Sequence, residues 1–150
     1  MRGRCTGCGT AQLNSATHCL RCGRLFMSST CAAHRDRIAE RACLICGRTL
    51  CRACRFGSRH APVCQYHEHV RIIQGWAEVA QFSDEVTALL TSDCLRSHDI
   101  EATILSQKDR WHVVSFGGLA VIRVLVPASM FVEAVRALES RSDASAWLAE

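Results

Sequence analysis

The distribution of cysteine constrains this chain more than any other feature of its sequence. The chain has 150 residues and 11 cysteines, and 10 of those cysteines lie between residues 5 and 64. A short cysteine-rich stretch with little aliphatic content cannot rest on a hydrophobic core alone, so it needs disulfides or bound metal ions. A single-core enzyme of the usual α/β kind is therefore not expected.

The state of these thiols depends on the compartment in which the protein works. The first residues, Met1–Cys5, contain no apolar region or cleavage site of a signal peptide. The longest apolar run, near Val113 to Val126, is interrupted by glycine and polar residues and is shorter than the ~20 residues that a membrane span needs. We therefore expect a cytoplasmic protein with reduced thiols and no membrane partner. In that setting paired cysteines more often bind metal than form disulfides.

The first cysteine cluster has the spacing of a complete metal site. Cys5-Thr6-Gly7-Cys8 is followed, after ten residues, by Cys19-Leu20-Arg21-Cys22. One Cys-x-x-Cys turn places two thiolates on a metal ion, and a second such turn completes a tetrahedron. The glycines that follow, Gly9 and Gly23, suit the positive φ at the end of such a turn. Two disulfides or free thiols are the alternative.

This first segment resembles the small zinc-ribbon domains found at the N-termini of many prokaryotic proteins. The resemblance rests on the repeated Cys-x-x-Cys-Gly motif and covers roughly residues 4–26. It implies a zinc-stabilised module over residues 1–28.

The second cluster contains four pairs of metal-binding residues. They are Cys31/His34, Cys43/Cys46, Cys51/Cys54 and Cys64/His67, and the gaps between the pairs are eight, four and nine residues. Four pairs make two tetrahedral sites. The gap of four is short for a link between independent fingers, so an interleaved arrangement is favoured, in which the first pair joins the third and the second joins the fourth. A sequential pairing uses the same ligands and remains open.

The centre of this cluster, Cys43–Cys54, is similar to a B-box-type zinc finger, and the likeness covers about residues 30–68. It implies a cross-braced zinc module over residues 29–69. The spacing of the last pair departs from eukaryotic B-boxes, so an association with ubiquitin ligases does not carry over.

The sequence thus predicts about three Zn²⁺ per chain and no catalytic residue. Each site has four protein ligands, whereas a catalytic zinc usually keeps one position open. His18, His60 and His69 lie near the ligands and could replace one of them, but the pair spacing is satisfied without them. The twelve predicted ligands are Cys5, Cys8, Cys19, Cys22, Cys31, His34, Cys43, Cys46, Cys51, Cys54, Cys64 and His67.

Aliphatic periodicity replaces the cysteines from about residue 70. Strands are expected at 76–80, 100–105, 111–116 and 119–126, with a two-residue hairpin at Gly117-Gly118. A first helix is expected to start with Ser83 as its N-cap and to bury Val86, Leu89, Leu90 and Cys94. A second helix is expected to begin at Pro127.

This order of elements predicts a ferredoxin-like α+β sandwich over residues 70–150, with both helices on one face of the sheet. The fold class is therefore α+β, with two small zinc-stabilised modules before the sandwich. The acidic turn after Phe82 and the Val-Pro at residues 126–127 also resemble the prokaryotic "putative signal-transducing protein" domain family. That resemblance implies sensing or protein interaction and supplies no catalytic residue.

Charge and motifs lead to two functional hypotheses of different classes. Residues 1–67 carry 11 Arg against Asp36 and Glu40, formally +9, while residues 68–150 are formally −5. Our first hypothesis is a non-enzymatic zinc-binding adaptor or regulatory protein that contacts a protein partner. The alternative is a nucleic-acid-binding regulator, which would use the arginines beside the knuckles: Arg21, Arg24, Arg48, Arg52, Arg55 and Arg59. A ligase-like enzyme and a redox sensor are further alternatives, and the sequence leaves the oligomeric state undecided.

Overall fold

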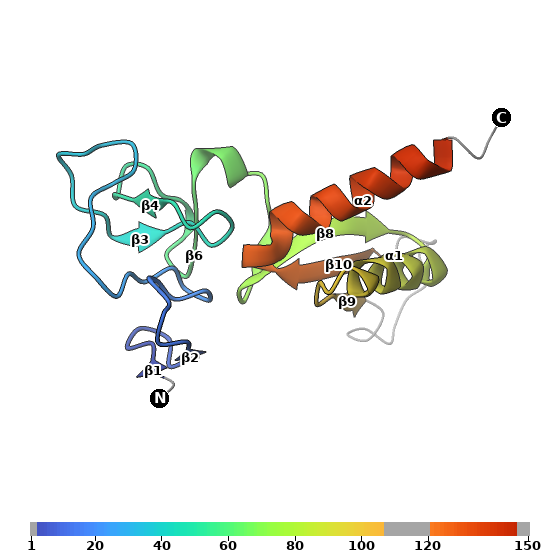
Figure 1. Ribbon diagram of the computed structural model, residues 1–150, viewed down its shortest axis with the longest axis horizontal. Coiled ribbons are helices and arrows are strands. Elements are labelled where there is room, and N and C mark those ends of the chain that lie inside the picture. Colours follow the sequence, from blue (N-terminus) through green and yellow to red (C-terminus); the bar gives the residue numbers. More distant parts are fainter. Residues whose placement is uncertain (1–2, 107–120, 147–150) are drawn as a thin grey trace, which may run out of the picture. The chain divides into compact units, whose positions relative to one another are not determined.

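The computed structural model describes residues 3–106 and 121–146 and divides the chain into two compact units, Met1–Gly75 and Trp76–Glu150. The first unit contains short strands and loops, and the second contains the two α-helices and the larger strands (Figure 1). The architecture is mixed α+β, as predicted. None of the described helices has the length and apolar character needed to cross a membrane.

The described part of the first unit contains three short antiparallel hairpins, and the loops of the first two carry the pairs Cys5/Cys8 and Cys43/Cys46. The hairpins are β1 (Gly3–Arg4) with β2 (Ala11–Gln12), β3 (Arg41–Ala42) with β4 (Thr49–Leu50), and β5 (Phe56–Ser58) with β6 (Ala61–Val63). The short helix η1 (Gln65–His67) and strand β7 (Ile72–Ile73) follow. The interior of this unit is shared by buried cysteines and by buried aliphatic side chains, Leu44, Leu50 and Val63 among them.

The two predicted zinc modules are in contact inside this unit. The Ala42 amide donates a hydrogen bond of 2.7 Å to the Gly23 carbonyl, and Arg24 forms an antiparallel bridge with Arg41. Gly23 is required at this contact, because a Cβ there would lie 2.4 Å from the Ala42 carbonyl oxygen.

The second unit has three strands side by side in the order β8-β10-β9. They are β8 (Trp76–Phe82), β10 (Ile122–Pro127) and β9 (Thr103–Ser106), and β10 is antiparallel to both neighbours. Strands β8 and β9 are therefore parallel, and α1 (Glu85–Ser97) connects them across β10. After β10 the chain passes through η3 (Ala128–Met130) into α2 (Phe131–Ala146).

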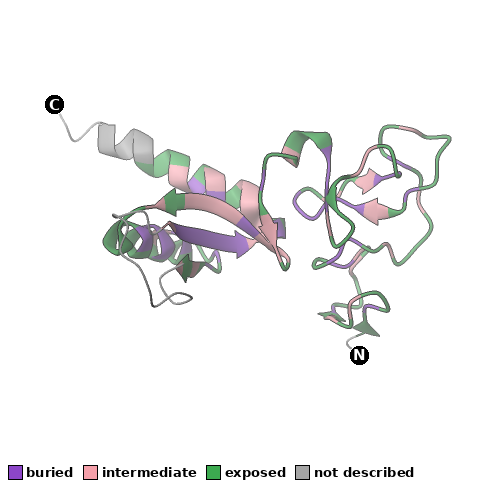
Figure 2. Ribbon diagram, turned by 180° about the vertical axis from the view of Figure 1, so that it is seen from behind, coloured by how far each residue is buried: buried purple, intermediate pink, exposed green. Residues whose placement is uncertain are grey.

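The core of this unit lies between the sheet and both helices. Alternate residues of β10, Ile122, Val124 and Val126, are at most 1 % exposed and belong to one cluster with Leu95 of α1 and Ala134 of α2. Figure 2 shows β10 as the buried strand of the sheet. Alternation places these branched side chains on one face, and burial of that face stabilises the unit.

Several predicted boundaries differ from the structure. The strand expected at 100–105 is β9, Thr103–Ser106, and the strand expected at 119–126 is β10, Ile122–Pro127. Pro127 ends that strand and is also the N-cap of the η3 turn, which fits the helix start expected at this residue, and α2 itself begins at Phe131. The strand predicted at 111–116 and the Gly117-Gly118 hairpin lie outside the described residues.

The first helix differs from the prediction in its cap and in its buried face. Asp84, not Ser83, is the N-cap, and its carboxylate accepts a hydrogen bond of 2.8 Å from the Thr87 amide. The buried residues are Ala88, Thr91, Ser92 and Leu95, whereas the predicted core residues Val86, Leu89 and Leu90 are 66 %, 45 % and 53 % exposed. Small side chains on the buried face let the helix approach the sheet closely. Cys94 is only partly buried and stands outside the core cluster.

Candidate metal centres

Three Cys-x-x-Cys turns share one backbone conformation. In each turn the amide of the first cysteine donates to the carbonyl five residues later, with N···O distances of 2.8 to 2.9 Å at Cys5, Cys19 and Cys43. The glycine four residues after that cysteine donates its amide back to the cysteine carbonyl. Gly9, Gly23 and Gly47 have φ values of 72°, 69° and 71°, a conformation that glycine adopts without steric cost. The turn therefore presents two sulfur atoms to one point.

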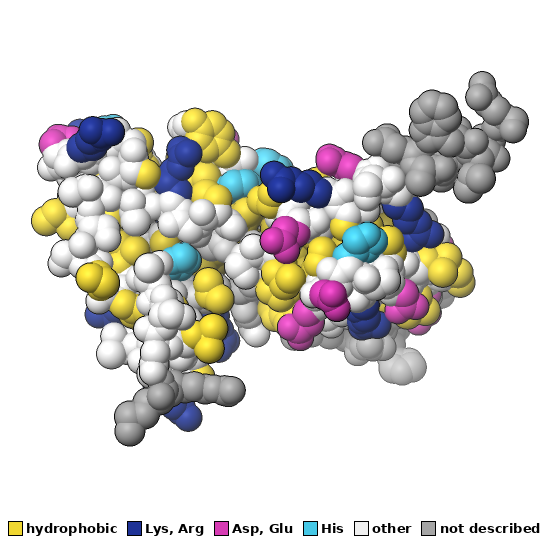
Figure 3. Space-filling model, viewed as in Figure 1, with side chains coloured by type: hydrophobic (Ala, Val, Ile, Leu, Met, Phe, Trp, Pro, Cys, Tyr) yellow, Lys and Arg dark blue, Asp and Glu magenta, His cyan; other side chains and the backbone are white. Residues whose placement is uncertain are grey.

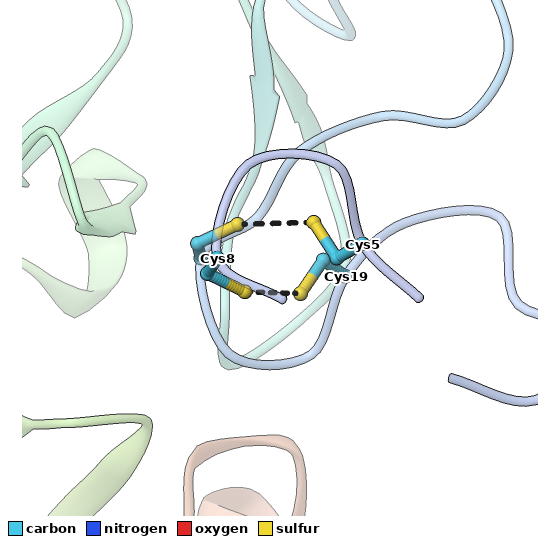
Figure 4. Close-up of side chains that lie close together, drawn as sticks. Cys5, Cys8 and Cys19 are labelled. Atoms are coloured by element: carbon cyan, nitrogen blue, oxygen red, sulfur yellow. Dashed lines mark hydrogen bonds between the residues drawn. The ribbon is translucent and has the colours of Figure 1, made fainter. Parts of the chain in front are cut away.

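The first cluster joins Cys5, Cys8, Cys19 and Cys22. The Cys5 and Cys22 sulfurs are 3.7 Å apart, and the Cys8 and Cys19 sulfurs are 3.5 Å apart. Figure 4 shows the side chains of Cys5, Cys8 and Cys19 turned toward a common centre. The Gln12 side-chain amide donates to the Cys19 sulfur at 3.4 Å, an interaction that stabilises a thiolate.

The second cluster joins Cys31, His34, Cys51 and Cys54. His34 Nδ1 lies 3.1 Å from the Cys54 sulfur, 3.7 Å from the Cys51 sulfur and 3.9 Å from the Cys31 sulfur. One imidazole nitrogen thus faces all three sulfurs.

The third cluster joins Cys43, Cys46, Cys64 and His67. His67 Nδ1 lies 3.3 Å from the Cys64 sulfur and 3.8 Å from the Cys43 sulfur, and the Cys46 and Cys64 sulfurs are 3.9 Å apart. All twelve predicted ligands are therefore gathered into three groups. The grouping within residues 31–67 is the interleaved one and not the sequential one.

The spacing of the donors fits metal coordination. Within each cluster the ligand atoms all lie within 4.8 Å of one another. A tetrahedral ion with metal–sulfur bonds of about 2.3 Å places neighbouring sulfurs about 3.8 Å apart. A disulfide needs about 2.05 Å, and every described cysteine is a free thiol. Each cluster can therefore hold one metal ion.

The neighbouring histidines do not join the clusters. None of His18, His60 and His69 belongs to the described ligand groups. His18 Nδ1 instead lies 3.0 Å from the Thr17 hydroxyl, and burial lowers the pKa of its ring.

The thiols of one cluster differ widely in pKa, because burial, hydrogen bonds and neighbouring thiols act on them unequally. Burial opposes ionisation of Cys8, but hydrogen bonds with Thr10 outweigh it and lower the pKa of that thiol to about 6. Cys31 is likewise opposed by burial, yet backbone hydrogen bonds and His34 lower its pKa to about 6. Burial raises the pKa of Cys19 to about 12, and burial together with the charge of Cys43 raises the pKa of Cys46 to about 12. Burial and the neighbouring thiols raise the pKa of Cys54 to about 11. A metal cation at the centre of a cluster offsets the repulsion between its neighbouring thiolates.

The arginines singled out in the sequence fall into two sets. Arg24, Arg52, Arg55 and Arg59 line one hollow of the first unit, together with Arg41, which was not among the predicted arginines. Arg41 is the first residue of β3 and lies far in sequence from Arg59, so only the folded chain reveals their proximity. Arg21 instead donates to the Thr10 hydroxyl, and Arg48 stacks 5.2 Å from the centre of the Tyr66 ring.

Comparisons of this chain with protein families, curated proteins and solved structures find no match.

Proposed function

We propose that the chain is a non-enzymatic zinc-binding adaptor or regulatory protein that contacts a protein partner. The observation that carries this proposal is the closed character of the three clusters, each with four protein donors within 4.8 Å. Four donors leave no position for a reacting water or substrate, so the metal acts in folding and presentation of a surface.

Zinc is the metal that best suits these donors. Thiolate and imidazole ligands in a tetrahedral group favour zinc over the hard cations calcium and magnesium. On this proposal residues 1–28 are a zinc ribbon and residues 29–69 a B-box-like cross-braced finger. The interleaved grouping of Cys31 through His67 supports the second assignment. Reduced thiolates also require a reducing compartment, so we propose a cytoplasmic location.

The second unit is proposed to be a ferredoxin-like domain of the prokaryotic signal-transducing type. Two parallel strands, β8 and β9, with antiparallel β10 between them and both helices packed on one core support that assignment. Its role on this proposal is to bind a partner or a ligand, while the zinc modules form a separate interaction surface.

Nucleic-acid binding is the second candidate function, and the five arginines around one hollow favour it. If phosphates are engaged, the affinity for single- or double-stranded oligonucleotides falls steeply with salt. Weak or salt-independent binding would remove this candidate.

Metal analysis with a matched pair of variants tests the proposal. The purified chain should hold about three zinc ions. Cys54→Ser removes a ligand of the second cluster and should lower that number, whereas Cys94→Ser, outside all clusters, should leave it unchanged. Chelation should then expose the first unit to a protease and spare the second, because all three clusters found among the described residues lie in the first unit. Full protection of the first unit without metal, or a metal with an exchangeable water, would refute the adaptor proposal. Pull-down with the zinc-loaded chain would identify the partner.

A further inference from the structure

A hollow in the first unit combines a high density of positive charge with exposed aliphatic side chains. It has a volume of about 790 Å³ and is lined by Arg24, Arg41, Arg52, Arg55 and Arg59. These arginines come from both predicted zinc modules, so the hollow exists only when the whole unit is folded.

The charge in this hollow is poorly balanced. Glu40 is the only acidic residue of its lining, and its carboxylate lies 3.6 Å from the Arg55 guanidinium. Within residues 3–106 and 121–146, the other four lining arginines have no ion pair. Thiolates on the neighbouring metals offset part of the positive charge, but they are mostly buried while Arg24, Arg52 and Arg59 are exposed. An anionic group is therefore the favoured occupant.

The same hollow presents aliphatic side chains to solvent. Met27 is 74 % exposed and Ile38 is 78 % exposed. Figure 3 shows hydrophobic side chains at the surface of the first unit. The backbone at Ile38 is held on both sides. Ile38 forms an antiparallel bridge with Thr30, and the Ala39 amide donates a hydrogen bond of 2.8 Å to the Ser29 carbonyl. A rigidly held, exposed aliphatic side chain marks a contact site better than a mobile one does.

The surface around Ile38 extends beyond this hollow. Ile38 also lines two adjoining hollows, one of about 680 Å³ with Thr30 and Thr49 and one of about 380 Å³ with Arg37 and Arg52. An extended segment could therefore contact Ile38 from both sides.

The chemistry of the lining favours a peptide over a nucleic acid. Single-stranded nucleic acids are held by aromatic side chains on which bases stack, and the lining has one aromatic residue, Phe26. The most exposed apolar side chains are the aliphatic Met27 and Ile38.

We propose that this arginine-lined hollow binds an acidic segment of a partner protein that also carries an aliphatic side chain. The carboxylates of the segment pair with Arg24, Arg52 and Arg59, and its aliphatic side chain packs on Met27 and Ile38. The inference rests on the proposed adaptor function, because the metal clusters hold the hollow in shape.

Binding of synthetic probes to the metal-loaded full chain tests the inference. The probes are a fluorescein-labelled oligo-glutamate peptide with interspersed leucines, the same peptide with serine for leucine, and a labelled oligo-dT strand. Fluorescence anisotropy should show the leucine peptide binding tightest. Arg52→Glu combined with Arg59→Glu should weaken its binding about tenfold or more. The single change Arg71→Glu, exposed and outside the hollow, should alter its binding less than about twofold, and each of Arg52→Glu and Arg59→Glu alone should alter it more.

Two further variants separate the aliphatic contribution from folding defects. Ile38→Ser should weaken binding of the leucine peptide about fivefold and leave binding of the serine peptide unchanged. Glu40→Gln should tighten the binding of both peptides, because it removes a negative charge from the hollow. A misfolded protein would not gain affinity.

The outcomes separate this inference from the proposed function. A chain with a full complement of zinc that binds neither peptide would overturn the inference alone. Tighter binding of oligo-dT than of the leucine peptide, with the same loss in the arginine variant, would overturn it in favour of nucleic acid. A chain that holds no zinc would overturn the proposed function instead.

Discussion

At the residue scale, two glycines with similar φ angles allow the cost of backbone strain to be measured apart from the cost of a steric clash. Gly9 and Gly23 both have φ near 70°, but a Cβ at Gly9 would meet nothing within 4 Å, whereas one at Gly23 would lie 2.5 Å from the Pro62 ring. Gly9→Ala should lower the free energy of unfolding of the metal-loaded first unit by about 1 kcal/mol, the cost of a positive φ. Gly23→Ala should lower it by more than about 2 kcal/mol, because backbone must also move. Denaturant titration at fixed free metal compares the two, and equal losses would show that the Gly23 contact is relaxed at no cost.

A buried ion pair in the second unit gives a prediction of a different kind. Arg123 Nε lies 3.0 Å from a Glu78 carboxylate oxygen, with side chains only 11 % and 9 % exposed. Arg123→Met should destabilise the unit by about 3 kcal/mol, since it leaves a buried carboxylate without its partner.

The double variant provides the control for that pair. Adding Glu78→Gln to Arg123→Met should recover part of the loss, because the carboxylate charge is gone. Thermal unfolding followed by circular dichroism measures Arg123→Met, Glu78→Gln and the double variant. Additive losses would indicate that the two side chains act independently.

The pKa values of the clustered cysteine thiols predict how metal affinity depends on pH. Thiols whose pKa is raised, namely Cys19 and Cys46 to about 12 and Cys54 to about 11, are protonated at neutral pH before metal binds. Metal must displace those protons, so affinity rises with pH and falls on acidification. Below about pH 6 Cys8 and Cys31 also take up protons, and the loss of affinity should steepen. Competition with a chelator across the range from acid to neutral pH measures this, and a flat profile would contradict it.

At the scale of elements, the start of α1 offers a matched pair of variants. Asp84→Ala removes the hydrogen bond of 2.8 Å from the Thr87 amide and should lower the melting temperature of the second unit by a few degrees. Ser83→Ala should have little effect, because Ser83 makes no cap. The Thr87 hydrogen bond also lowers the pKa of Asp84, so its contribution is present above the ordinary aspartate pKa and is lost as pH falls through the lowered value. Equal melting temperatures for the two variants would show that the cap is unimportant.

The same helix shows where sequence periodicity misleads. Val86, Leu89 and Leu90 recur at helical spacing, but the sheet packs on the face of Ala88, Ser92 and Leu95. Two competing faces exist in the sequence, and the small side chains decide because they permit close packing. The N-cap was ambiguous for a similar reason, since Ser83 and Asp84 are both good caps and only the folded backbone selects one.

At the scale of the whole molecule, the three Cys/His groups were predictable because short-range sequence pairs make them up. Each Cys-x-x-Cys or Cys-x-x-His pair is complete within four residues, and the short gap between Cys46 and Cys51 already favoured interleaving. The arginine-lined hollow was not predictable as a unit. It needs Arg24, Arg41 and Arg59, from three separate parts of the first unit, to meet, and such long-range proximity leaves no local pattern.

Interleaving of the second and third clusters has a consequence for how the chain assembles. The loop closed by Cys31 and Cys54 overlaps the loop closed by Cys43 and His67, so residues 43–54 belong to both. Neither cluster can bind its ion while residues 43–54 are unstructured. Binding of one ion orders this stretch and so brings ligands of the other cluster into position. Scarce metal should therefore yield a mixture of chains with both ions and chains with none, and half-occupied molecules should be rare.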